Sequence, residues 1–151
     1  MRIREDDLTG ERIRSFLREH LEHMYEVTPP ESVHAIDVNQ LREPGVTFWS
    51  AWEGEELLGC GALRALDAKT GEIKSMRTVG SKRRGGIGTA ILEHMVEEAR
   101  RRDYERLYLE TGSMEAFRPA RTFYERHGFE YCGPYSDYTD DPNLVFMTMK
   151  L

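Results

Sequence analysis

Residues 72 to 99 constrain the fold of this chain more than any other stretch. Residues 72–79 are predicted to form a β-strand, and residues 89–99 place apolar side chains on one face of a helix. The short basic segment between them contains Gly85, Gly86 and Gly88. The chain is therefore expected to run from a strand, through a glycine loop, into the N-terminus of a helix.

This loop has the features of an anion-binding site. The first backbone N–H groups of a helix have no partner within the helix and carry partial positive charge. Glycine lacks the Cβ atom that would keep a phosphate away from those N–H groups. Lys82, Arg83 and Arg84 add full positive charges at the rim. The predicted ligand is a polyphosphorylated molecule.

Two common phosphate-binding motifs are absent from the loop. A Walker A motif ends in Gly-Lys-Ser/Thr, whereas Gly88 is followed here by Thr89 and Ala90. The dinucleotide fingerprint Gly-x-Gly-x-x-Gly is also missing. The loop therefore belongs to neither motif class.

The strand before the loop carries charges that a buried strand rarely holds. A strand covered on both faces is nearly all apolar, but Glu72, Lys74, Ser75 and Arg77 interrupt this one. Unpaired charges are costly to bury, so these side chains either pair with each other or line a wet cleft. Because side chains alternate along a strand, Glu72 and Lys74 point to the same face.

Length and charge limit the functions to be considered. The 151 residues are enough for a single domain, 1–151, with a core of its own. A net charge of −6 argues against nucleic acid or a membrane surface as partner.

The sequence contains no signal segment and no apolar run of membrane length, so we expect a cytoplasmic location. Cys60 and Cys132 lack metal-ligand spacing and are expected to be free thiols, and no metal is predicted.

The remaining periodicity predicts further elements on both sides of the central unit. Helices are expected at about 9–25, at 38–41 after a possible cap by Asp37, and at 117–127 before an αL cap at Gly128. Gly59 and Gly61 predict a bulge or a close backbone contact. Strands are expected at 1–4, 46–52, 57–66, 106–110, 129–132 and 144–151.

Three features in order along the chain resemble the GNAT N-acetyltransferase superfamily. Arg83-x-x-Gly86-x-Gly88 is similar to its acetyl-CoA pyrophosphate motif, Arg/Gln-x-x-Gly-x-Gly/Ala. The segment 120–129 resembles the helix signature Ala-x-x-x-Tyr-Glu-x-x-Gly-Phe. Glu72 lies eleven residues before Arg83, where many members carry a catalytic carboxylate. The segments 29–35, 47–52 and 72–77 further resemble a small bacterial subgroup, the YsnE-like acetyltransferases.

The resemblance implies an α/β (α+β) fold. Its central sheet is expected to be mixed, mostly antiparallel and twisted, with six to seven strands and about four flanking helices. The sheet is expected to splay at its central parallel strands, where acetyl-CoA binds. The implied function is acetyl transfer from acetyl-CoA to the amine of a small molecule or amino-acid-like acceptor, by direct attack in a ternary complex. A homodimer is possible, as in many members of the superfamily.

The resemblance also implies roles for individual residues. Glu72 is the expected catalytic base and Tyr124 the expected proton donor to the leaving sulfur, although a core aromatic with a satisfied hydroxyl would explain Tyr124 equally. A backbone N–H near 76–78 is the expected oxyanion donor. Many members carry an Asn shortly after the preceding strand, where this chain has the segment 111–114 instead, and Ser113 is expected to substitute for it through its hydroxyl. The expected cofactor contacts are Met76, Arg77, Thr78, Arg83, Arg84, Gly85, Gly86, Ile87, Gly88, Thr89, Ser113 and Ala120.

The acceptor site is expected near the acidic, aromatic segment 134–143, because carboxylates and aromatic faces attract cations. An ordinary solvated loop has the same composition. Several arginines leave room for an acceptor with a carboxylate, namely Arg64, Arg77, Arg118 and Arg121. The expected acceptor contacts are His34, Lys74, Tyr135, Asp137 and Tyr138.

Two alternatives remain open at this stage. One is acetylation of a protein N-terminus or lysine. The other is a non-catalytic module that binds CoA for sensing or assembly.

Overall fold

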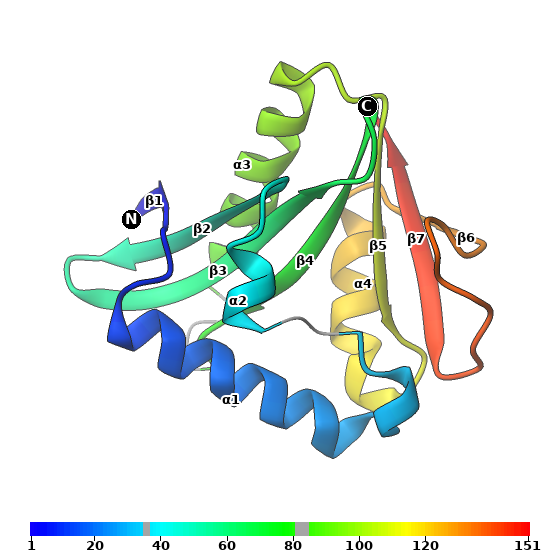
Figure 1. Cartoon of the computed structure of the whole chain (residues 1–151), viewed down its shortest axis with the longest axis horizontal. Helices are drawn as coiled ribbons and strands as arrows, with labels where there is room; N and C mark the ends of the chain where they lie inside the picture. Colours follow the sequence, from blue (N-terminus) through cyan, green and yellow to red (C-terminus); the bar gives the residue numbers. More distant parts are fainter. Residues whose placement is uncertain (35–36, 81–84) are drawn as a thin grey trace.

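The computed structural model describes residues 1–34, 37–80 and 85–151 (Figure 1). Its strands form a seven-stranded sheet with the order β1-β2-β3-β4-β5-β7-β6. The strands are β1 (Arg2–Glu5), β2 (Val46–Glu53), β3 (Glu56–Ala65), β4 (Thr70–Thr78), β5 (Arg106–Gly112), β6 (Glu130–Cys132) and β7 (Leu144–Lys150). The helices are α1 (Glu11–Val27), α2 (Val38–Leu41), α3 (Ile87–Arg101) and α4 (Arg118–Arg126), with short 3-10 turns at η1 (Pro30–Ser32) and η3 (Glu115–Phe117).

The sheet is mixed and mostly antiparallel, as predicted. Only β4 and β5 pair in parallel, and their pairing covers just Thr70 to Glu72 against Arg106 to Tyr108. Beyond those residues the two strands diverge, although β4 continues to Thr78 and β5 to Gly112. The sheet is therefore split at its centre, which confirms the expected splay.

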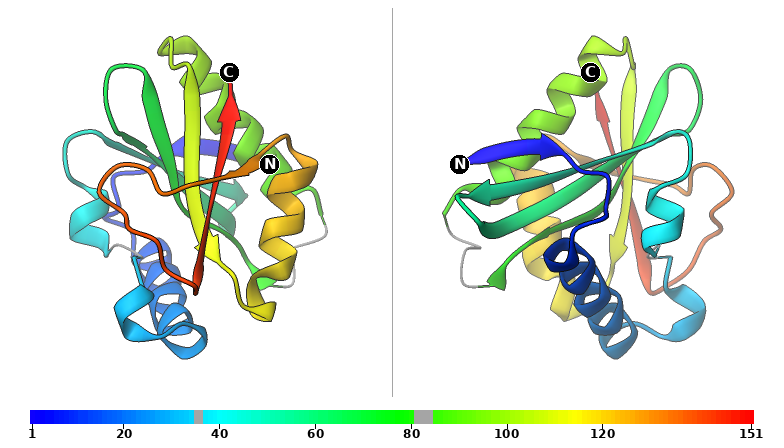
Figure 2. Two further views of the ribbon diagram at one scale, coloured as in Figure 1. Left: turned by 90° about the vertical axis from the view of Figure 1, so that its right-hand side faces the viewer. Right: turned by 60° about the vertical axis from the view of Figure 1, so that its left-hand side comes forward.

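Helices cover both faces of the sheet. In the side views of Figure 2 the sheet lies between α3 and α4 on one side and α1 and α2 on the other. Side chains alternate along β2, so its aromatic residues point to both faces of the sheet. Trp49 packs in the apolar core beside α3, and Phe48 packs in the apolar core beside α1. Trp49 and Trp52 are both core residues, with 3% and 9% of their surface exposed.

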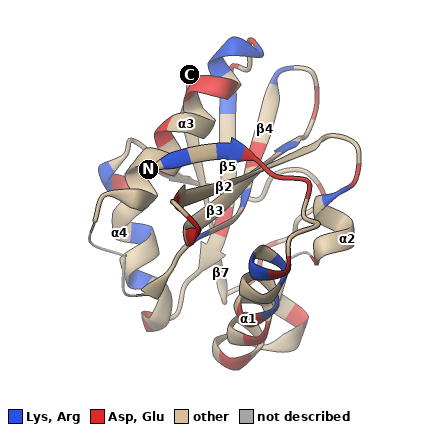
Figure 3. Ribbon diagram, turned by 90° about the vertical axis from the view of Figure 1, so that its left-hand side faces the viewer, with Lys and Arg blue, Asp and Glu red and all other residues tan. Residues whose placement is uncertain are grey.

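Local chemistry explains where the helices lie. Helix α1 buries Ile13, Phe16 and Leu17, while basic and acidic residues alternate on its outer surface (Figure 3). It ends two residues later than expected and stops before the proline pair 29–30, which cannot continue it. Asp37 caps α2 through a reciprocal hydrogen-bond pair with Gln40, so the predicted capping role is confirmed.

Gly59 and Gly61 on β3 allow both features that the sequence predicted. A Cβ on Gly59 would lie 2.8 Å from the carbonyl oxygen of Arg77, and one on Gly61 would lie 2.8 Å from Cε of Met95. The β3–β4 register also shifts between Cys60 and Ala62. Glycine at both positions therefore lets α3 and β4 approach β3 closely.

Within the described ranges, the helices are all too short or too polar to cross a membrane.

Candidate active site

Two cavities meet at the split in the sheet. The larger, of about 520 Å³, lies between the end of β4, the start of α3, helix α4 and helix α1. The smaller, of about 130 Å³, lies in the gap between β4 and β5. Residues that line both cavities mark their junction: His20, Met24, Met76, Phe117, Ala120 and Tyr124. A ligand in one cavity can therefore contact a ligand in the other.

The glycine loop opens on the larger cavity. Gly86 is the N-cap of α3 with a φ of 77°, a left-handed conformation that favours glycine. The N–H of Ala90 bonds to the Gly86 carbonyl, so the N–H groups of residues 87–89 precede the first bond of the helix. Gly86, Gly88 and Thr89 line the cavity. This arrangement presents helix N-terminal amides to a ligand.

Other residues expected near the cofactor divide into three groups. Met76, Arg77, Thr78 and Ala120 line the larger cavity. Gly85 lies in the turn and Ile87 is buried in the core, and neither lines a cavity. Arg83 and Arg84 lie outside the described residues.

Arg77 is held at the cavity wall by His20. Its Nη1 donates to Nδ1 of His20 over 2.9 Å. Burial of the imidazole, together with the Arg77 charge and that of His23, lowers the pKa of His20 to about 4. His20 is therefore neutral at physiological pH and can accept this hydrogen bond.

A β-bulge shapes the strand at the junction. Cys60 pairs with Arg77 and Ala62 with Lys74, so β4 carries one more residue than β3 across this interval. Ser75 has a φ of 53°, and its carbonyl accepts from the Cys60 thiol at 3.3 Å. The glycines of β3 predicted an irregularity at this place, but the sequence did not show that β4 carries the extra residue.

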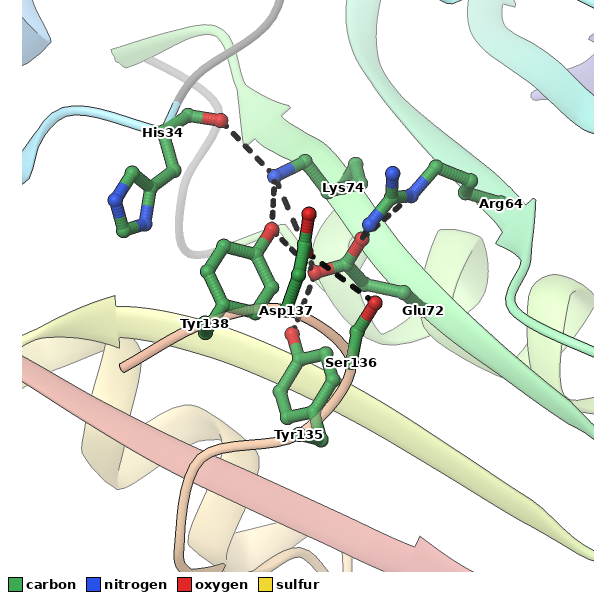
Figure 4. A network of polar contacts seen from close by, with 8 residues as sticks. All are labelled: His34, Arg64, Glu72, Lys74, Tyr135, Ser136, Asp137 and Tyr138. Carbon is green, nitrogen blue, oxygen red and sulfur yellow. Dashed lines mark hydrogen bonds and ion pairs between the residues drawn. The ribbon is translucent and has the colours of Figure 1, made fainter. Parts of the chain in front are cut away.

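Glu72 lies at the centre of a buried polar network (Figure 4). Its side chain has no exposed surface. One oxygen, Oε1, accepts from Arg64 at 2.9 Å through Nε and pairs with Nη2 at 2.8 Å. The other, Oε2, accepts from Tyr135 at 2.5 Å and Tyr138 at 2.8 Å, with Lys74 Nζ 4.0 Å away.

This geometry corresponds to the ion-pair alternative for Glu72. Both carboxylate oxygens have partners within the protein, and Glu72 lines neither cavity. Burial, and next the neighbouring Glu72, raise the pKa of Tyr135 and Tyr138, so both hydroxyls remain donors. Of the two alternatives for Glu72, the ion pair agrees with these contacts and the wet cleft does not, and its role as base stays a prediction.

Lys74 and His34, two of the expected acceptor contacts, line the smaller cavity. The Lys74 side chain is 6% exposed and donates to the His34 carbonyl and the Tyr138 hydroxyl, both at 3.0 Å. The His34 ring packs against Tyr138 with centroids 4.9 Å apart. Burial and the Lys74 charge lower the pKa of His34, so its ring is neutral at neutral pH.

The other expected contacts do not line the smaller cavity. Tyr135 and Tyr138 bind Glu72 instead, and Asp137 is exposed. The hydroxyl of Ser113 donates to the Pro142 carbonyl at 2.6 Å, so Ser113 holds the β6–β7 connection and lines neither cavity. Tyr135, Tyr138 and Ser113 therefore make structural contacts beside the site.

Three of the four arginines considered for a carboxylate are engaged elsewhere. Arg64 pairs with Glu72, Arg118 pairs with Glu115 at 3.1 Å, and Arg121 donates to the carbonyls of Gly112 and Met114. None of these three lines either cavity. Lys74 therefore supplies the cation at the smaller cavity.

Glu110 on β5 is a candidate that the sequence analysis missed. It lines the smaller cavity opposite Lys74. Burial raises its pKa from 4.5 to about 7, against the opposing effect of the Lys74 charge. The predicted strand ended at this residue, and an acidic side chain at the end of a buried strand was the one signal available. A carboxyl with a pKa near 7 suits proton transfer at neutral pH.

Tyr124 on α4 lines both cavities. Within the described part of the chain its hydroxyl makes no hydrogen bond, and it is not among the fully buried atoms without a partner, so it opens on the cavities. Burial, and then the nearby Glu110, raise its pKa, so the phenol stays protonated. The alternative of a hydroxyl satisfied by the backbone is thus absent from the described contacts.

No group of three or more His, Cys, Asp and Glu side chains that could hold a metal ion occurs among the described residues.

The fold and its paired cavities define a site where two ligands meet across a split sheet, as a group-transfer enzyme requires. The model of the acetyltransferase (GNAT) family matches residues 11–129. This chain belongs to that family, and it is an acetyltransferase. The fold and class implied by the sequence motifs are therefore confirmed.

Relatives match along nearly the whole chain. The uncharacterized N-acetyltransferase YsnE of Bacillus subtilis strain 168 is 58% identical over 151 residues, covering 100% of both chains. The uncharacterized N-acetyltransferase YedL of Escherichia coli K12 is 46% identical, covering 99% of this chain and 94% of YedL. An IAA acetyltransferase of Azospirillum brasilense is 36% identical, covering 85% of this chain and 84% of the relative.

Solved structures share the fold. The putative acyl-CoA N-acyltransferase from Klebsiella pneumoniae superposes with a TM-score of 0.78 at 25% identity, covering 99% of this chain and 97% of the other. A GNAT family acetyltransferase from Elizabethkingia anophelis with acetyl-CoA bound has a TM-score of 0.71 at 18% identity, with coverage of 99% and 97%.

Proposed function

We propose that this protein transfers an acetyl group from acetyl-CoA to the amine of a small molecule by direct attack in a ternary complex. The observation that carries the proposal is the junction of the two cavities at Met76 and Tyr124. Acetyl-CoA occupies the larger cavity and the acceptor enters the smaller one. The thioester and the amine then meet at the split between β4 and β5.

The glycine loop supports diphosphate binding. The N–H groups of residues 87–89 have no earlier carbonyl within the helix, and the helix dipole favours an anion there. The pantetheine arm extends along β4 beyond Glu72, where β5 no longer pairs with it. The relative with acetyl-CoA bound has the same fold, which is consistent with this assignment.

Glu110 is the proposed general base, in place of Glu72. An alkyl ammonium has a pKa of about 10.4 and no lone pair, so it must lose a proton before attack. Glu110 lines the acceptor cavity and titrates near neutral pH, whereas the oxygens of Glu72 are occupied by protein donors. Glu110 accepts the ammonium proton, and the free amine then attacks.

The remaining steps use the strand bulge and Tyr124. The N–C bond forms, and an N–H of β4 near Met76 stabilises the oxyanion. The C–S bond then breaks, and sulfur leaves with the proton of Tyr124. The second proton on the nitrogen passes to solvent, and solvent reprotonates the phenol. The proton acceptor is the leaving thiolate, which becomes the thiol of CoA as the C–S bond breaks.

A thiol-release assay tests this function. Purified protein and acetyl-CoA are incubated with a panel of small amines, amino acids, and peptides with free N-termini or lysines, while calorimetry measures acetyl-CoA binding. The proposal predicts binding and CoA release with small amines or amino acids. Binding with no release from any acceptor would instead identify a CoA-binding module, and release with peptides alone would identify a protein acetyltransferase.

Gly86→Ala is expected to weaken acetyl-CoA binding at least tenfold, measured by calorimetry. An L-residue at a φ of 77° costs about 1 kcal/mol, and relief of that strain moves the amides of the loop. Gly54→Ala is a matched control, because Gly54 has a φ of 58° and, like Gly86, no atom within 4 Å of its virtual Cβ. It should lose similar stability and keep its affinity. Equal affinity in both variants would remove the loop from the cofactor site.

Tyr124→Phe is expected to lower kcat by about 10- to 100-fold, because sulfur loses its proton donor. Folding should be little affected, since the hydroxyl has no partner among the described residues. Rapid-mixing measurement of CoA release separates this step from binding. Tyr135→Phe serves as a comparison that loses the hydrogen bond to Glu72 and hence stability. Full turnover in Tyr124→Phe would exclude the proton-donor role.

A further inference from the structure

Two buried polar atoms, in residues that line the smaller cavity, lack hydrogen-bond partners. They are Oγ1 of Thr28 and Nδ1 of His34, and across the described residues they are the buried side-chain nitrogen and oxygen atoms without one. Thr28 is only 5% exposed. Both residues line the cavity in the gap between β4 and β5. Buried polar atoms are nearly always satisfied, so a pair of unsatisfied ones in one cavity points to a ligand.

The segment that carries these atoms is fixed in place. Thr28 caps the C-terminal end of α1, and η1 follows it. Within η1, the Ser32 hydroxyl donates to Asp141 Oδ2 at 2.5 Å and accepts from Asn143 Nδ2 at 3.3 Å. The chain after α1 is thus tied to the connection between β6 and β7, and the unsatisfied atoms are held at the cavity wall.

Lys74 offers a third donor in the same cavity. Its ammonium has three hydrogens, and two of them bind the His34 carbonyl and the Tyr138 hydroxyl. Glu72 is 4.0 Å away, which is beyond hydrogen-bond distance. The Glu72 carboxylate also pairs with Arg64. Two cations therefore share the Glu72 carboxylate, and the Lys74 charge also acts on Glu110, which lines the same cavity.

We propose that the acceptor is a compact molecule with both an amine and a carboxylate, such as an α-amino acid. Its carboxylate binds Lys74 Nζ, Thr28 Oγ1 and His34 Nδ1. Its amine points to Glu110 and to the junction of the cavities. The inference rests on the proposed function, because it assigns the acceptor of that same site.

The size and charge of the cavity support this class. A volume of about 130 Å³ suits a small amino acid better than a peptide segment. Glu110 on β5 and Lys74 on β4 line opposite walls, so a cation and an anion of one molecule can each face a side chain of opposite charge. A simple alkylamine would leave the three donors without an acceptor.

Thr28→Val tests the carboxylate contact. The substitution is nearly isosteric and removes a hydroxyl without a protein partner, so the fold should be retained. We expect kcat/KM for the best amino acid, relative to its decarboxylated amine, to fall about tenfold through KM. Thr148→Val is the matched control, because its buried hydroxyl donates to the Leu107 carbonyl at 2.9 Å. It should lose thermal stability and retain the substrate ratio.

Lys74→Met and Lys74→Arg provide a second test, with circular dichroism to verify folding. The ratio of amino acid to decarboxylated amine should fall about 100-fold in Lys74→Met and be partly restored in Lys74→Arg. The inference is overturned if wild-type protein acetylates decarboxylated amines or amino-acid amides as efficiently as the amino acids, while the proposed function then stands. If acetyl-CoA binds but the whole panel releases no CoA, both are overturned.

Discussion

Glu110→Gln is expected to lower kcat by about 100- to 1,000-fold while leaving the affinity for acetyl-CoA intact. The amide keeps the shape of the side chain but cannot accept the ammonium proton, and general-base catalysis typically contributes this much. Glu110 lines the acceptor cavity rather than the cofactor cavity, so binding and turnover should separate. Steady-state kinetics together with calorimetry measures both quantities.

The pH dependence of kcat provides a second test of Glu110 as the base. The pKa of Glu110 is about 7, and the base must be deprotonated to act. Wild-type kcat should therefore fall about tenfold for each pH unit below 7, and this limb should vanish in Glu110→Gln. Glu105→Gln is the control, because Glu105 is exposed and pairs only at the surface with Lys69, 3.2 Å away. It should keep both the rate and the profile.

The same residue should also affect stability. Because its pKa is raised from 4.5 to about 7, the folded state binds more protons than the unfolded state between those values. Stability should fall as pH rises through this window, and Glu110→Gln should remove that loss. We expect the variant to exceed wild type by about 3 kcal/mol in free energy of unfolding at pH 8. Urea titrations at pH 5 and pH 8 measure it; normal turnover together with lower stability at pH 8 would reject Glu110 as the base.

Glu72→Gln is expected to act on stability more than on chemistry. The neutral amide leaves the buried Lys74 and the partly exposed Arg64 without their shared anion. Breaking a buried ion pair typically costs about 3 to 5 kcal/mol, and Glu72 has no exposed surface. Thermal and urea unfolding should show a loss of this order. At temperatures where both variants are folded, turnover should fall far less than in Glu110→Gln.

A double-mutant cycle identifies the source of that loss. The variant with both Glu72→Gln and Arg64→Gln should lose less than the sum of the two single losses, because the second change removes the unpaired cation. If Glu72→Gln instead keeps its stability and loses turnover about 1,000-fold, then Glu72 is the base that the motif spacing predicted.

The polar network around Glu72 also explains why the segment between β6 and β7 is rich in tyrosine. Its aromatic residues suggested acceptor binding, but Tyr135 and Tyr138 direct their hydroxyls to Glu72. The ring of Tyr135 stacks on Tyr108 of β5 with centroids 4.8 Å apart. The segment therefore packs against the sheet through Glu72 and Tyr108. Substitution of Glu72 should weaken this packing.

Local sequence patterns were sufficient for most of the fold. The glycine segment predicted a loop that leads into a helix N-terminus, and the helical period predicted α3. Asp37 before a short apolar turn predicted the cap of α2. Each of these features depends on residues close together in the chain, through φ, capping and side-chain period, so the sequence carries enough information. The family motifs then supplied the sheet topology.

The identity of the proposed base and the shape of the acceptor cavity depended on contacts between distant segments. Alternation showed that Glu72 and Lys74 share a face, but Glu72 meets Tyr135 across 63 positions in the chain. Whether Glu72 or Glu110 faces the cavity follows from which strands diverge and which side chains cover each carboxylate. Burial and pairing are properties of the packed molecule. The sequence therefore predicted the strand, the loop and the type of chemistry, and packing decided which carboxylate lines the smaller cavity.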